Sequence, residues 1–144
     1  MNTMTLIKRR LQEICRRYQL ELVYAYGSRC RELKNYLDEK GFINKSATSD
    51  LDIGVNVSRD SQLSIKDKVR LTIELEDLFD TDQVDLAVLS EVNPFVAVNI
   101  IRGERLYCED DYVADEYELY ILRRAGDLAH LEHDRLNIVF RDAL

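Results

Sequence analysis

The fold is decided by the stretch Ser49-Asp50-Leu51-Asp52-Ile53-Gly54-Val55, in which polar or small residues alternate with branched apolar ones. This alternation predicts a β-strand, because successive side chains on a strand point to opposite faces. Asp50 and Asp52 lie two residues apart, so we expect their carboxylates on one face of that strand. The apolar residues take the opposite face and form a buried layer. Gly54 is expected to keep the acidic face open.

The rest of the chain predicts an α/β (α+β) domain, because helical and strand-like patterns follow one another. Helices are indicated by apolar residues at helical spacing, and strands by runs of β-forming residues. The predicted helices cover 5–18 and 65–79, and the predicted strands cover 20–26, 51–57, 83–89 and 105–108. The order up to residue 89 is therefore helix, strand, loop, strand, helix, strand.

Three helical features follow from local residue patterns. The core-facing stripe of the helix over 65–79 is expected to consist of Ile65, Val69, Ile73 and Leu78. Asn93 as an N-cap and Pro94 at the first helical position start a helix that Gly103 ends. Tyr112 to about Arg141 is one long helix or two, and Gly126 is its weak point.

Length and composition bound the class of protein. The 144 residues, 46% of them hydrophobic, fit a single domain over 1–144, with 109–144 as a C-terminal helical extension. The formal charge of −7 disfavours a long nucleic acid as direct substrate. No apolar run approaches the roughly 20 residues that span a membrane, so we expect a cytoplasmic protein. The cysteines, expected to be reduced thiols, are Cys15, Cys30 and Cys108.

A second strand pattern adds another carboxylate. In Gln83–Leu89, Asp85 faces one way, whereas the apolar residues on either side of it face the other. If this strand lies beside the one that carries Asp50 and Asp52, three carboxylates converge. Like charges so close require protonation or a neutralising cation. Magnesium fits best, because it takes a few carboxylates together with water and substrate phosphates.

A possible phosphate site follows the first predicted strand. Gly27 and Ser28 stand at its end, ahead of a helix predicted over 31–40. A glycine allows a ligand to approach the backbone closely, and the backbone N–H groups at a helix start bind phosphate oxygens. Arg29 adds a positive charge there.

Together these motifs resemble those of the minimal nucleotidyltransferases of the DNA polymerase beta-like superfamily. The pattern is Gly27-Ser28, then Ser49-Asp50-Leu51-Asp52, then Asp85 on a later strand. The resemblance implies a small mixed sheet of the nucleotidyltransferase type. It also implies two Mg²⁺ ions held by Asp50, Asp52 and Asp85, with the last also activating the acceptor hydroxyl. ATP would be bound through Gly27, Ser28, Arg29 and Ser49.

The chain departs from the usual pattern of this family in two places. Cys30 and Glu32 stand where family members commonly have a small residue and a glycine. Nineteen residues, 30–48, separate Arg29 from Ser49, which is longer than the loop typical of minimal members. We expect this insertion to alter access to the site or a partner surface.

Three functions are compatible with this resemblance. The first is adenylylation of a tyrosine of a partner HEPN toxin, so that the chain acts as an antitoxin, alone or in a homo- or hetero-oligomer. The second is a binding module that neutralises its partner by docking, without catalysis. The third is nucleotidyl transfer to a small molecule such as an aminoglycoside.

Other interpretations of the same residues stay open at this point. Asp50 and Asp52 are also compatible with a solvated strand edge. His130 and His133 are three residues apart on a predicted helix, yet they lack further ligands at zinc spacing and are expected on the surface. Tyr117 is expected in a core or interface stripe rather than in a platform for a base.

Overall fold

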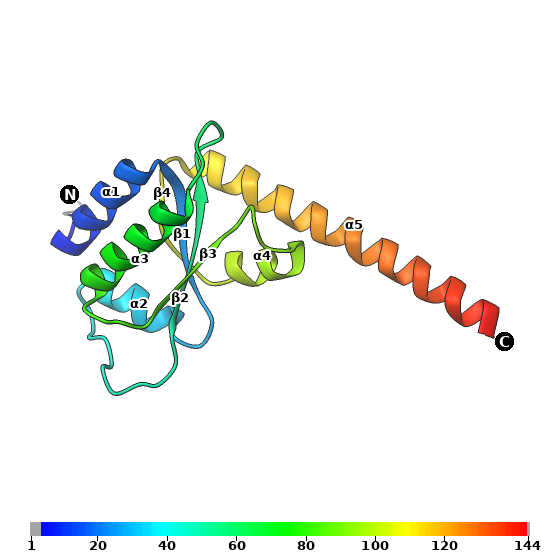
Figure 1. Ribbon diagram of the computed structural model, residues 1–144, viewed down its shortest axis with the longest axis horizontal. Helices are drawn as coiled ribbons and strands as arrows, with labels where there is room; N and C mark the ends of the chain where they lie inside the picture. The colour runs from blue at the N-terminus through cyan, green and yellow to red at the C-terminus, as the bar shows by residue number, and fades with distance from the viewer. Residues whose placement is uncertain (1–3, 144) are drawn as a thin grey trace.

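Four strands form one mixed sheet in the order β3-β2-β1-β4. The computed structural model describes residues 4–143, with side chains described as far as Val139 (Figure 1). The elements are α1 (Leu6–Tyr18), β1 (Leu20–Tyr26), α2 (Cys30–Leu37), β2 (Leu51–Val57), α3 (Ile65–Phe79), β3 (Val84–Val88), α4 (Pro94–Ile101), β4 (Glu104–Cys108) and α5 (Asp111–Ala143). The α/β class and the mixed sheet are confirmed.

The strand directions explain how the chain builds this sheet. β1 runs antiparallel to both β2 and β4, whereas β2 and β3 run parallel. A parallel pair needs a crossover connection, and α3 supplies it. The start of α3 is defined by a capping box, in which Ser64 and Asp67 each satisfy a backbone N–H of the other.

One face of the sheet carries the main core. α1, α2 and α3 cover this face (Figure 1), and Leu51, Ile53 and Val55 of β2 are fully buried beneath them. The alternation that predicted β2 therefore separates a buried side from a polar side, as expected.

The predicted core stripe of α3 is wrong in three of its four positions. Ile65, Val69 and Ile73 are 81%, 54% and 50% exposed. The side chains of α3 that face the core are Leu71, Leu75, Leu78 and Phe79. Both sets have helical spacing, so periodicity alone cannot separate them.

The opposite face of the sheet is covered by α4 and α5. Here Gly54 does not keep the acidic face open, as was expected of it. A Cβ atom at this position would lie 2.5 Å from Ile100 Cγ2, so glycine serves to let α4 pack directly on β2. The face becomes accessible two residues before Gly54, at the half-buried Asp52.

The C-terminal segment is one helix rather than two. α5 runs through Gly126 without interruption, and a Cβ there would meet nothing within 4 Å. The helix packs on the domain as far as Ala125, whereas all of 129–139 is exposed and projects away from the sheet (Figure 1). Within residues 4–143, no helix is long and apolar enough to cross a membrane.

Candidate active site

The sheet register places three polar side chains in one row. Tyr26 of β1 pairs with Asp52 of β2, and Asp52 pairs with Asp85 of β3. Residues paired directly across strands have side chains on the same face, with Cβ atoms about 4.5 to 5.5 Å apart. The two aspartate strands therefore lie side by side, which is the condition on which the predicted convergence of carboxylates depends. Tyr26 was not predicted as part of this row, because the register between β1 and β2 cannot be derived from local patterns.

The turn after β1 closes on this row. Gly27 has a φ of 76°, a left-handed conformation that favours glycine. A Cβ on Gly27 would lie 2.5 Å from Asp52 Oδ2, so the turn and the carboxylate leave no room for a side chain at this position. Gly27 and Ser28 are both exposed, and α2 begins two residues later, at Cys30. Phosphate binding at this turn stays a prediction.

The electrostatics of the row reflect its crowding. Burial raises the pKa of Asp52, and the charges of Asp85 and Asp50 raise it further. The pKa of Tyr26 is also raised, first by burial and then by the charges of Asp52 and Asp85. The two aspartates of β2 and β3 therefore interact unfavourably as anions, which a cation would relieve.

The three predicted carboxylates are brought together loosely. Asp50 precedes β2 and is exposed, as is Asp85, whereas Asp52 is half-buried. Among residues 4–139, no group of three or more His, Cys, Asp or Glu side chains is close enough to form a ready cage for one ion. A metal would therefore gather these side chains by rotating them.

Arg29 lies in a different environment from the one that was expected. Its side chain is buried, and its guanidinium donates to both carboxylate oxygens of Glu32 and to the carbonyl oxygens of Ser49 and Asn44. The direct nucleotide contact expected of Arg29 stays a prediction, since the contacts in the structure are all to α2 and to the loop 38–50. Ser49 is exposed at the end of that loop.

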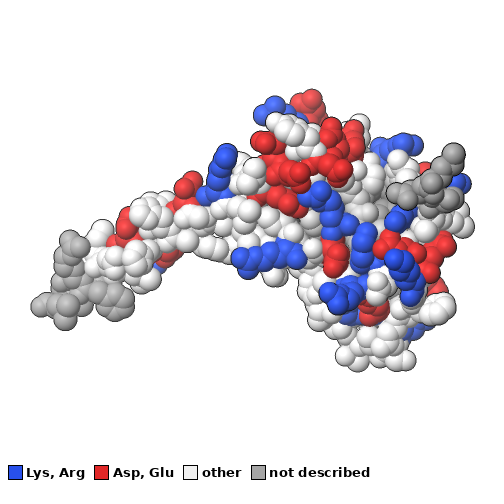
Figure 2. Space-filling model, turned by 180° about the vertical axis from the view of Figure 1, so that it is seen from behind, with Lys and Arg blue, Asp and Glu red and all other residues white. Residues whose placement is uncertain are grey.

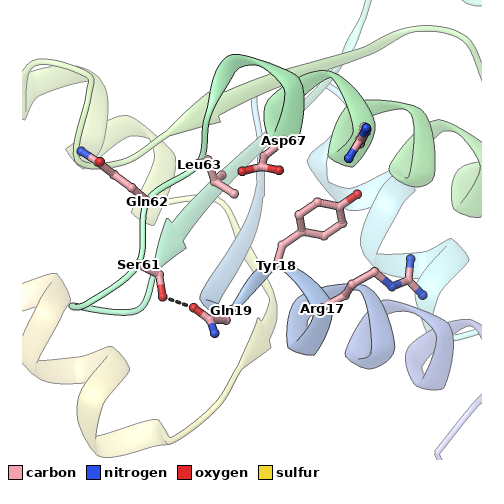
Figure 3. Close-up of a pocket in the computed structure, with 8 residues that line it drawn as sticks. Arg17, Tyr18, Gln19, Ser61, Gln62, Leu63 and Asp67 are labelled. Atoms are coloured by element: carbon pink, nitrogen blue, oxygen red, sulfur yellow. Dashed lines mark hydrogen bonds between the residues drawn. The ribbon is translucent and has the colours of Figure 1, made fainter.

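Other candidate positions lie away from this row. His130 is on the exposed part of α5, and Tyr117 packs against the cluster beneath α5. Acidic and basic side chains are mixed over the globular part of the molecule, without a continuous basic stripe on the side that Figure 2 shows. An open hollow between α1 and α3 is lined by polar residues, among them Arg17, Gln19 and Ser61 (Figure 3). It lies at the start of β1, whereas the carboxylate row lies at its end.

Comparison with known proteins identifies the class to which this fold and site belong. The chain belongs to the polymerase beta nucleotidyltransferase family, which matches residues 9–112. This match runs from α1 to the start of α5 and contains every residue of the row. No curated protein matches the chain.

Several solved structures with the same fold are toxin–antitoxin complexes. The chain is 19% identical to a chain of the MntA–HepT toxin–antitoxin complex, covering 96% of this chain and 98% of that one, with a TM-score of 0.58. The chain is 18% identical to a chain of a toxin–antitoxin structure with AMP-PNP. The match covers 95% of this chain and 98% of that one, with a TM-score of 0.59. The chain is 19% identical to a chain of the tri-AMPylated Shewanella oneidensis HEPN toxin in complex with MNT antitoxin. The match covers 99% of this chain and 100% of that one, with a TM-score of 0.58. At such identities the likeness shows the fold.

Proposed function

We propose that this nucleotidyltransferase transfers AMP from ATP to a tyrosine hydroxyl of a partner HEPN toxin and thereby acts as an antitoxin. The observation that carries the proposal is the pairing of Asp52 with Asp85 beside the Gly27 turn, in a chain of this family. The site combines a carboxylate row with an exposed turn at Gly27 and Ser28, ahead of the start of α2. This is the combination that nucleotide transfer from a triphosphate requires.

The carboxylates suit magnesium in their chemistry. Asp50, Asp52 and Asp85 offer the hard oxygen atoms that Mg²⁺ prefers. Burial raises the pKa of Asp52, and the charges of Asp85 and Asp50 raise it further; a divalent cation would offset these charges. Two bound Mg²⁺ ions would supply positive charge for the attacking oxygen and for the leaving pyrophosphate. Asp50 and Asp52 would hold both ions, and Asp85 would complete the site.

The other residues would bind and orient the reactants. The backbone at Gly27 and the hydroxyls of Ser28 and Ser49 would hold the phosphates by donating hydrogen bonds to their oxygens. The acceptor oxygen attacks the α-phosphorus, a new O–P bond forms, and the bond from this phosphorus to the bridging oxygen breaks. Pyrophosphate leaves with that oxygen, and the carboxylate of Asp85 takes the proton of the acceptor hydroxyl.

Two observations support a protein as the acceptor. The similar structures are toxin–antitoxin complexes, and one of them contains an AMPylated HEPN toxin. The chain's net charge of −7 also suits a basic partner such as a ribonuclease. We place this reaction in the cytoplasm, in an oligomer of the chain with its toxin. The domain is proposed to span 1–144, with 109–144 as its helical extension.

The test is label transfer from α-labelled ATP. The protein is incubated with Mg²⁺ and a lysate of its own host, beside the Asp52→Asn and Asp85→Asn variants. Asp82→Asn is the matched control, because Asp82 is an exposed carboxylate that precedes β3. We expect label on one discrete protein with the wild type and the control, and none with the other two variants. Equal labelling by all four proteins would refute the proposal.

Docking without catalysis is a second candidate, and α5 favours it. Leu131, Leu136, Ile138 and Val139 are between 47% and 62% exposed on a helix that projects from the domain. Such side chains are more typical of a surface that a partner covers. If the wild type neutralises a co-purified toxin without ATP, and Asp52→Asn does so equally, docking is the function. Labelled small molecules instead of protein would favour an acceptor of the aminoglycoside type.

A further inference from the structure

A buried charged side chain lies next to the candidate site. Arg29 and Asn56 are the buried polar or charged residues among those whose burial is described, and Arg29 is 6% exposed. Its guanidinium donates to Glu32 over 3.2 and 2.6 Å, to Ser49 O over 2.6 Å and to Asn44 O over 3.1 Å. A buried charge of this kind is tolerated when it is paired and its donors are satisfied.

Glu32 completes the same network from α2. One of its carboxylate oxygens, Oε2, accepts from the guanidinium of Arg29 and also from the backbone N–H of Asn44 at 2.9 Å. Glu32, which departs from the usual motif, therefore binds both Arg29 and the backbone of the loop. Arg29 and Glu32 together hold two backbone points, residues 44 and 49, of the loop 38–50.

The loop 38–50 depends on few other anchors. It contains no helix or strand as far as the structure describes it, and Phe42 within it is 92% exposed. Ile43 is buried, Asp38 at the start of the loop pairs with Lys8 at 2.8 Å, and Lys45 forms an exposed ion pair with Asp80. Exposed ion pairs contribute little to order. The Arg29–Glu32 pair is thus the main polar attachment between this loop and the site.

The end of this loop determines where Asp50 lies. Asp50 makes no side-chain hydrogen bond within residues 4–139, so its position depends on its backbone neighbours. On one side, Ser49 O accepts from Arg29, and on the other, Leu51 N–H donates to Gln83 O at 2.7 Å. Loss of the first bond would free Asp50 to move away from the row.

We propose that Arg29 and Glu32 are positioning residues that hold the loop 38–50 and thereby place Ser49 and Asp50 for metal and nucleotide binding. This inference rests on the proposed function. In this proposal Arg29 acts by holding the backbone carbonyl of Ser49. Glu32 has a role that the family motif does not contain.

The test compares Glu32→Ala and Glu32→Gln with the control Asp80→Asn. Asparagine suits residue 80, which has a positive φ, and this control removes the Lys45–Asp80 ion pair of the same loop. We measure the Mg²⁺ concentration for half-maximal AMP transfer, the thermal shift produced by Mg²⁺ with ATP, and hydrogen exchange over 40–52. Since loss of an orienting partner typically weakens metal binding 10- to 100-fold, we expect Glu32→Ala to raise the half-maximal Mg²⁺ concentration at least about 10-fold.

The pattern of results separates positioning from a general loss of stability. Saturating Mg²⁺ should restore most of the turnover of Glu32→Ala, Glu32→Gln should be intermediate, and Asp80→Asn should match the wild type. Exchange at residues 44 and 49–51 should be faster in Glu32→Ala. Unchanged Mg²⁺ dependence and unchanged exchange would overturn the proposal. If Glu32→Ala does not fold, the same measurements on Glu32→Gln test the proposal. A wild type without transfer would refute the proposed function, and exchange would then decide the role of the pair.

Discussion

At the scale of single residues, Asp52 is the side chain in which function and stability oppose each other most directly. Its pKa is raised by burial and by two neighbouring carboxylates, so the folded state disfavours its charge at neutral pH. A neutral side chain of the same shape would remove that repulsion. Active sites are often destabilised in this way by the groups that they need.

Asp52→Asn is therefore expected to raise the Tm in the absence of divalent metal. A shift of about 2 to 4 °C would correspond to each kcal/mol in a chain of this size. The same variant should lose at least about 100-fold in transfer activity, because metal ions contribute several kcal/mol to such reactions. Differential scanning calorimetry in EDTA measures the first effect, with Asp82→Asn as the control. A lower Tm for Asp52→Asn would contradict this account.

Gly27 presents a second test at this scale. An alanine there would require a left-handed backbone and would place its Cβ 2.5 Å from Asp52 Oδ2. The backbone conformation alone costs about 1 to 2 kcal/mol. We expect Gly27→Ala to be destabilised by at least that amount and to lose ATP-dependent transfer. Urea unfolding checks the stability, and Gly126→Ala, at a helical position with open space, is the matched control that should fold at least as well.

At the scale of elements, the contact between α4 and β2 controls how much of the acidic face is covered. A Cβ on Gly54 would lie 2.5 Å from Ile100 Cγ2, and Ile100 is fully buried. Overpacking of a core contact typically costs about 1 to 3 kcal/mol. Gly54→Ala should therefore be destabilised by that amount, as measured by urea unfolding.

A double variant tests the cause of this effect. Ile100→Ala alone leaves a cavity and is destabilised, but in combination with Gly54→Ala it removes the atom that clashes. The two substitutions should therefore couple favourably, and the double variant should be more stable than the sum of the single effects predicts. Simple additivity would show that α4 does not pack on β2 as described.

At the scale of the whole molecule, the pH dependence of stability reflects the ion pairs Arg29–Glu32 and Lys8–Asp38, which connect segments around the loop 38–50. The hydrogen bond from Arg29 lowers the pKa of Glu32, and the hydrogen bond from Lys8 lowers the pKa of Asp38. Because the folded-state pKa is below the ordinary value, each group stabilises the fold at neutral pH. That contribution is lost as pH falls below the ordinary carboxyl value of about 4 and through the lowered folded value.

We expect the free energy of unfolding to fall steeply below about pH 4. Urea unfolding between pH 6 and pH 3 measures it. Asp52, whose pKa is raised, acts in the opposite direction, because protonation relieves its repulsion. Glu32→Gln should flatten the acid limb of the curve, whereas Asp52→Asn, which removes the opposing contribution, should make that limb at least as steep as in the wild type. An equally steep limb in Glu32→Gln would argue against the pair.

The sequence by itself determined the elements and the chemical character of the site. The alternation around Asp52 marked β2 with its correct bounds, and the spacing of Asp85 marked β3 to within one residue at each end. These are local properties, because period and capping depend on near neighbours along the chain. The family motif rests on the same residues.

Only the tertiary structure decided which surfaces and side chains meet. It selected Leu71 and Leu75 over the equally periodic Val69 and Ile73, placed Tyr26 beside Asp52, and paired Arg29 with Glu32 and the loop. It also showed that Gly54 admits α4 instead of opening the face. Each of these outcomes depends on strand register and on packing between segments distant in sequence. Such contacts cannot be recognised from the periodicity of the residues that make them.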